Sequence, residues 1–179
     1  MIWLSNSTIA RLRDQLRNTG QRPSVALGDG PMTPEAAELA ATKAEYGPIS
    51  EAMYLMMSAD GKISSEERDV LKGALRNLSG DTIRSVYIEA LLDDAAKSAA
   101  EQGREARLQD VLGTLQEDRA RAEVTFVLAA AIAFADNAIA DEENETLNMF
   151  AEGLGIDESR ANELLDTVEA DLAERPAAD

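Results

Sequence analysis

Residues 59–67 of the chain read Ala-Asp-Gly-Lys-Ile-Ser-Ser-Glu-Glu, and residues 135–143 read Ala-Asp-Asn-Ala-Ile-Ala-Asp-Glu-Glu. Each residue of the second phrase lies 76 positions after its counterpart, and two leucines follow each phrase at the same spacing. In each copy an apolar helix is expected to end, a turn to follow, and a helix with two glutamates in its first turn to begin. A phrase repeated at a fixed spacing indicates a duplicated supersecondary unit. The sequence therefore predicts two related helix-turn-helix units.

The composition favours an all-α fold. Hydrophobic residues make up 45% of the 179-residue chain but aromatic residues only 4%, so aliphatic side chains must fill the core. Ala, Leu and Glu are frequent, and all three are good helix formers. The spacing of apolar residues, together with capping pairs such as Ser64 with Glu67 and stop signals at Gly80 and Gly155, predicts a bundle of eight or nine helices and no strand.

The chain is predicted to have two parts, residues 1–45 and residues 46–175. The first is a helix to about Arg17 and a Gly- and Pro-rich linker, and Gly47-Pro48 is expected to break or kink the next helix. Residues 1–23 carry an excess of three positive charges, whereas the whole chain has a net charge of −17. An amphipathic basic helix either docks on its own protein or meets a membrane surface or an acidic partner, and docking is the commoner fate.

The absence of Cys and His excludes several kinds of chemistry. Disulfides, Cys/His zinc sites, haem held by His and triads with a His base all need those residues. The net charge of −17 argues against nucleic-acid binding, which requires clustered Lys and Arg. The longest apolar run, residues 126–135, is too short to span a membrane, for which about 20 residues are needed. No signal peptide is visible, so we expect a soluble cytoplasmic protein.

The acidic residues of the two phrases have two interpretations. Carboxylates near a helix N-terminus commonly act as caps, and this is the more frequent role. Alternatively they bind a divalent cation, which in a chain without Cys or His would be Ca²⁺, Mg²⁺ or Mn²⁺. The first phrase matches the second half of an EF-hand loop. The two ligand positions that should precede each phrase are Met56 and Ser58 in the first copy and Ile132 and Phe134 in the second, and three of these four are apolar, so a normal EF-hand is rejected. The remaining metal hypothesis is one site shared by Asp60, Glu67, Asp136 and Glu143.

The doubled phrase resembles the TerB-like domain, named from tellurite-resistance proteins, over about residues 45–172. The resemblance implies an all-helical fold, acidic residues proposed to bind a metal, and association with membrane-linked stress-response machinery. The metal-binding role that the resemblance implies carries over to the acidic positions of both phrases, which are Asp60, Glu66, Glu67, Asp136, Glu142 and Glu143. The second phrase departs from the pattern at Asn137 and Ala138, where a glycine and a variable residue are usual.

We therefore expect a non-enzymatic, cytoplasmic stress-response protein of the tellurite-resistance type. It would bind protein partners, including membrane-associated components, and a divalent cation at the acidic helix junctions, with neither zinc nor haem. The alternative is a metal-free adaptor whose acidic face recognises a basic partner. A hydrolase using carboxylates and a hard metal is disfavoured, because the chain offers no base beyond Asp and Glu.

Overall fold

The computed structural model describes residues 4–18, 33–58, 63–134 and 141–173, without the side chains of 141–144 and 172. This part of the chain is all-helical, as predicted, and contains eight α-helices and no strand. The helices are α1 (Asn6–Asn18), α2 (Pro34–Met57), α3 (Ser65–Ser79), α4 (Ser85–Gln102), α5 (Arg104–Gln116), α6 (Arg119–Ala133), α7 (Asp141–Gly153) and α8 (Glu158–Ala173).

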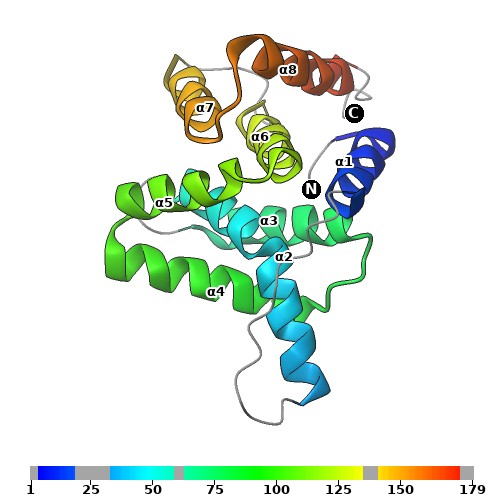
Figure 1. The fold of residues 1–179 in the computed structure, drawn as a ribbon, viewed down its shortest axis with the longest axis vertical. Helices are drawn as coiled ribbons and strands as arrows, with labels where there is room; N and C mark the ends of the chain where they lie inside the picture. The colour runs from blue at the N-terminus through cyan, green and yellow to red at the C-terminus, as the bar shows by residue number, and fades with distance from the viewer. Residues whose placement is uncertain (1–3, 19–32, 59–62, 135–140, 174–179) are drawn as a thin grey trace.

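Two helices, α2 and α6, organise the bundle. Helix α2 packs against α3, α4, α5 and α6, while α6 also packs against α1, α7 and α8 (Figure 1). The apolar run of α6 explains its central place, because nearly every residue from 122 to 133 is buried. A helix that is apolar on all sides must be surrounded by others. The N-terminal half of α2 projects from the lower end of the molecule in this view.

The helix boundaries confirm the duplication. Helices α2 and α6 end 76 residues apart, at Met57 and Ala133, and α3 and α7 begin 76 residues apart, at Ser65 and Asp141. The leucines that follow the two phrases are all buried, with 2% exposure or less, and are Leu71, Leu78, Leu147 and Leu154. The pairs α2–α3 and α6–α7 are therefore the two predicted helix-turn-helix units.

A proline inside α2 does not break the helix, so a break was the wrong one of the two expectations for Gly47-Pro48, and a kink stays a prediction. Pro48 has no N–H to donate to the carbonyl of Ala44, four residues earlier, and an unpaired carbonyl is costly. Arg121 of α6 donates to that carbonyl at 3.4 Å, and the Ser50 hydroxyl donates to the carbonyl of Gly47 at 2.9 Å. Helix α2 is thus continuous across residues 45 and 46, so the predicted boundary between the two parts of the chain lies within this helix. The division into two parts stays a prediction.

Helix α1 docks on the body, which confirms the first of the two predictions for the N-terminal segment. It packs against α3 and α6, and its apolar stripe is buried. The buried apolar residues of this segment are Leu4, Ile9, Leu12 and Leu16. Across the described residues, we find no helix with the length and apolar character that crossing a membrane requires.

Candidate functional site

The first acidic junction lies between α2 and α3, and the structure describes both of its ends. Helix α2 ends at Met57, its C-cap residue Ser58 is fully buried, and Arg104 of α5 donates to the Leu55 carbonyl in the last turn at 2.8 Å. Helix α3 begins with the predicted capping box: Ser64 Oγ accepts from the Glu67 N–H at 3.2 Å, and Glu67 Oε2 accepts from the Ser64 N–H at 2.7 Å. The Glu67 carboxylate therefore acts as a helix cap.

Glu66 differs from Glu67 because its side chain is exposed to solvent. Its Oε2 accepts a 3.2 Å hydrogen bond from the neighbouring Ser65 hydroxyl. Ile63, just before the cap, is partly buried and packs against the hydrophobic core. Of the first phrase, then, the described part consists of a packed isoleucine, a capping glutamate and an exposed glutamate.

The remaining predicted ligands fall outside what the structure describes. Asp60 and Asp136 lie outside the described residues, as does Ile139, and so do the side chains of Glu142 and Glu143 in the first turn of α7. Helix α3 packs mainly on α1, α2 and α4, whereas α7 packs mainly on α5 and α6. Among the described side chains, no group of three or more acidic residues is placed to hold a metal ion. The shared metal site stays a prediction.

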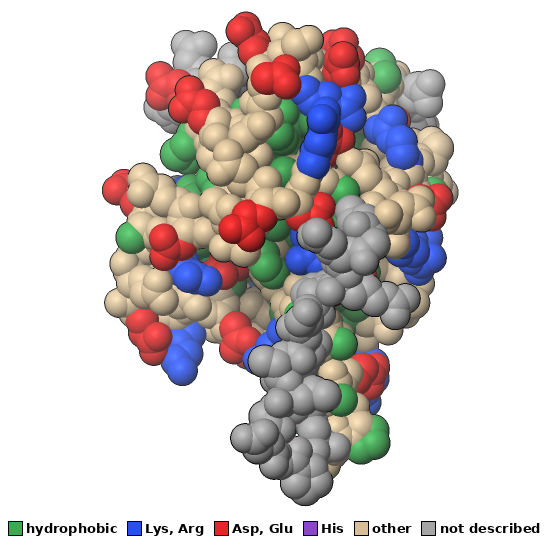
Figure 2. All heavy atoms as spheres, in the orientation of Figure 1, with side chains coloured by type: hydrophobic (Ala, Val, Ile, Leu, Met, Phe, Trp, Pro, Cys, Tyr) green, Lys and Arg blue, Asp and Glu red, His purple; other side chains and the backbone are tan. Residues whose placement is uncertain are grey.

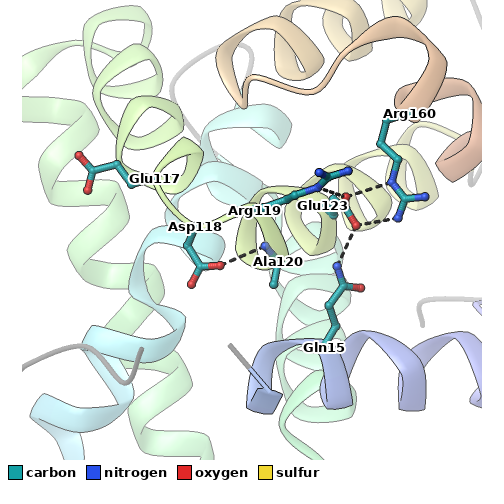
Figure 3. A pocket seen from close by; sticks show the side chains of 7 residues that line it. All are labelled: Gln15, Glu117, Asp118, Arg119, Ala120, Glu123 and Arg160. Carbon is teal, nitrogen blue, oxygen red and sulfur yellow. Dashed lines mark hydrogen bonds and ion pairs between the residues drawn. The ribbon is translucent and has the colours of Figure 1, made fainter. Parts of the chain in front are cut away.

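A second charged centre, which the sequence analysis did not identify, lies where α1, α6 and α8 meet. Glu123 of α6 has 4% exposure, and four donors approach its carboxylate. Arg160 of α8 donates through Nε to Oε1 at 3.0 Å and through Nη2 to Oε2 at 2.8 Å. Arg119 Nε donates to Oε1 at 3.0 Å, and Gln15 Nε2 of α1 donates to Oε2 at 2.9 Å (Figure 3).

The pKa of Glu123 follows from these contacts. The hydrogen bonds from Arg160 lower it most, those from Arg119 and Gln15 add to the effect, and burial opposes it, leaving a pKa of about 2. The hydrogen bond to Glu123 in turn raises the pKa of Arg160. The pair is therefore ionised at neutral pH, and the two-pronged geometry is the strong form of the Arg–carboxylate interaction.

An open pocket of about 510 Å³ adjoins this centre. Its lining residues are Gln15, Glu117, Asp118, Arg119, Ala120, Glu123 and Arg160. Asp118 Oδ1 accepts from the N–H groups of Ala120 and Arg121, so it caps α6. Glu123 has each oxygen doubly hydrogen-bonded, which leaves it poorly suited to take a proton from a substrate. These hydrogen bonds hold α1, α6 and α8 together, which is a structural role.

One local signal for this centre was present in the sequence. Glu123 is four residues after Arg119 and three residues before the start of the apolar run, a costly place for a charge unless a partner is near. The decisive partner, Arg160, lies 37 residues further along the chain, and Gln15 lies 108 residues earlier. No spacing rule connects positions so far apart.

A family model described as tellurite resistance protein TerB matches residues 50–166, which is more than half of the chain. The chain belongs to the TerB family. Searches of curated proteins and of solved structures found no significant match.

The TerB segment begins inside α2 and ends inside α8. It therefore includes both acidic phrases and the Glu123–Arg160 pair. Helix α1, which supplies Gln15, lies outside it. Membership confirms the resemblance drawn from the doubled phrase, and the all-α fold agrees with it.

Proposed function

We propose that this TerB-family protein is a non-enzymatic, cytoplasmic protein of a stress response of the tellurite-resistance type. It acts by binding protein partners, including membrane-associated ones, and a divalent cation at its acidic helix junctions organises that binding. The observation that carries the proposal is the duplication itself: helices α3 and α7 begin at equivalent positions, each with two glutamates in its first turn. Two equivalent junctions supply the carboxylates that a hard cation requires.

The electrostatics support a binding role over catalysis. A general acid or base works best with a pKa near the operating pH. Two carboxyl groups instead have pKa values that are lowered, away from neutral pH. Hydrogen bonds from Lys72 and Arg68 lower the pKa of Glu89, and hydrogen bonds from Arg160 hold the pKa of Glu123 at about 2. Acidic side chains are scattered across the face drawn in Figure 2, with Lys and Arg between them. A net charge of −17 favours association with basic partners.

A metal-free adaptor is the second candidate, and the capping box favours it. Glu67 already uses one carboxylate oxygen to cap α3, which is the common structural role of such a residue. On this alternative the acidic surface recognises a basic partner directly, and the phrases serve to start helices.

Calorimetric melts decide between the two candidates. We expect Ca²⁺, Mg²⁺ or Mn²⁺ to raise the melting temperature of the chelator-treated protein, because an ion at about 100 times its Kd stabilises the folded state by about 2.7 kcal/mol. Asp60→Asn should abolish the shift, since it removes one charge at the junction. Asp166→Asn, the matched control, removes one exposed charge from α8 and should keep the shift. If none of the three ions moves the wild-type melt, the metal-free adaptor is the correct candidate.

A further inference from the structure

We propose that the surface beneath α1 is a binding groove for a basic amphipathic helix of a partner protein, and that α1 occupies this groove until the partner replaces it. The groove is formed by Ala74, Asn77 and Leu78 of α3, Glu123 and Leu128 of α6, and Asp171 of α8. We call it the α1 seat. It is separate from the acidic junctions, so the inference goes beyond the function proposed above.

The apolar part of the seat accepts side chains at helical spacing. Ile9 and Leu12 lie against Ala74, Leu78 and Leu128, and the five side chains enclose a small cavity together with Asn77. The exposed fractions of Ile9 and Leu12 are 8% and 2%. Residues three and four apart on a helix share one face, which is how helices dock into grooves.

In the hydrogen bonds described here between the seat and the N-terminal segment, the seat supplies the acceptor. Arg13 donates through Nη2 to the carbonyl of Asn77 at 2.6 Å and through Nε to that of Leu78 at 3.3 Å. These carbonyls belong to the last turn of α3, where free C=O groups and the helix dipole favour a cation. The seat therefore selects a helix that carries an arginine beside its apolar stripe.

In two more contacts the seat again supplies the acceptor and the N-terminal segment supplies the donor. Gln15 donates to Glu123 at 2.9 Å, and the backbone N–H of Ser5 donates to Asp171 at 3.0 Å. Net charge agrees with this pattern, since residues 1–23 are basic and the remainder of the chain is strongly acidic. Complementary charge steers a basic helix toward an acidic surface.

The seat remains formed when α1 leaves. Glu123 keeps both bonds from Arg160 and the bond from Arg119, so its carboxylate stays in place. Helix α1 has 13 residues, and an isolated helix of about that length is marginal in water, so its order depends on docking. It lies outside the TerB segment, which begins at residue 50. These features fit an occupant that another helix can replace.

A peptide titration of the full-length protein tests the proposal. The probe is a fluorescent peptide of residues 4–18, followed by anisotropy. The opened variant carries Ile9→Asn and Leu12→Asn, which removes two apolar contacts without changing charge. The matched control carries Ser7→Asn and Ala10→Asn on the exposed face of α1, which also leaves the charge unchanged and leaves α1 seated. A peptide with Leu12→Asn serves as the second control.

We expect the opened variant to bind the peptide at least ~10-fold more tightly than the wild type or the control variant does, because a seated α1 reduces the fraction of accessible seats. The Leu12→Asn peptide should bind no variant. An opened variant that keeps its helical circular dichroism but binds no better than wild type would overturn the proposal.

Hydrogen exchange on the wild-type protein gives an independent readout that does not depend on how the variants fold. We expect the amides of α1 to exchange at least ~10-fold faster than those of α3 and α6, because α1 opens by itself. Equal protection of the three helices would overturn the proposal. Light scattering should find a monomer, and a wild-type dimer that the opened variant lacks would assign the seat to α1 of a second copy and overturn the assignment to a partner.

Discussion

At the scale of single residues, Glu123 is the only Asp, Glu, Lys or Arg that is buried among the residues that the structure describes. Moving a carboxylate out of water costs several kcal/mol unless partners replace its hydration. Glu123 has such partners on three helices: the fork of Arg160, the guanidinium of Arg119 and the amide of Gln15. Its low pKa therefore links the stability of the α1–α6–α8 junction to pH.

Glu123→Gln should lower the free energy of unfolding by about 3 kcal/mol at pH 7, because neutral Gln resembles the protonated acid. The folded pKa of Glu123, about 2, lies below the ordinary value of 4.5, so the unfolded chain binds the proton first as pH falls. The stabilisation is complete above pH 4.5 and is lost as pH falls from 4.5 toward 2. Urea titrations at several pH values measure this loss.

The wild type and the Glu123→Gln variant should thus converge in stability near pH 2. Glu163→Gln is the matched control, because Glu163 also pairs with Arg160 but is exposed. It should leave the pH profile near that of the wild type. A constant gap between wild type and Glu123→Gln at all pH values would contradict the assignment.

At the scale of elements, the two helices that follow the acidic phrases end in the same way. Gly80 and Gly155 have φ values of +68° and +66°, in the left-handed region that side chains disfavour. In each helix, the N–H of the residue after the glycine donates to a backbone carbonyl in the last turns. The Asp81 N–H donates to the Arg76 carbonyl, and the Ile156 N–H donates to the Ala151 carbonyl. Helix α3 has 15 residues and α7 has 13, and the two glycines lie 75 positions apart, one fewer than the 76 that separate the two phrases.

Gly80→Ala should destabilise the protein by about 1–2 kcal/mol, because a left-handed backbone brings Cβ close to the carbonyl. The new methyl group would also lie 3.0 Å from the Arg13 guanidinium carbon. Gly73→Ala, inside the same helix and with no atom within 4 Å of the added Cβ, should instead stabilise by about 0.5–1 kcal/mol. Urea denaturation of both variants checks the sign, and effects of the same sign would contradict this account of the helix end.

At the scale of the whole molecule, ion pairs connect helices within a strongly acidic surface. Arg107 of α5 forms a two-pronged pair with Glu51 of α2, with its shorter contact at 2.6 Å, and this raises the pKa of Arg107. Arg68 of α3 reaches Glu89 of α4 at 2.8 Å. With 17 Lys and Arg against 34 Asp and Glu, these pairs cannot neutralise the surface, and the acidic excess repels itself.

Raising NaCl from about 10 mM to about 500 mM should therefore raise the melting temperature, since the screening length shortens from about 30 Å to a few ångströms. Calorimetry in chelator-treated buffer measures the shift. Choline chloride is the control for a specific effect of sodium and should act equally. A melting temperature that falls with salt would mean that local ion pairs outweigh the net repulsion.

The sequence by itself determined the features that depend on neighbours a few residues apart. The capping box of Ser64 and Glu67, the glycine stop at residue 80 and the amphipathic stripe of α1 all arise within one or two helical turns. The repeat then placed the same boundaries in the second unit. Hence the all-α class, the duplication and the docking of α1 were predictable.

Only the tertiary structure decided what distant residues do for one another. Helix α2 passes through Pro48 because Arg121 of α6 satisfies the carbonyl that the proline leaves without a donor. Glu123 can be buried because Gln15 and Arg160 reach it from other helices. Asp60 and Asp136 lie outside the described residues, so the shared metal site stays a prediction. Hydrogen bonds between residues a few positions apart follow from their spacing in the chain. Partners that stabilise a buried charge, or a carbonyl left without a donor, come also from distant residues that only helix packing brings near.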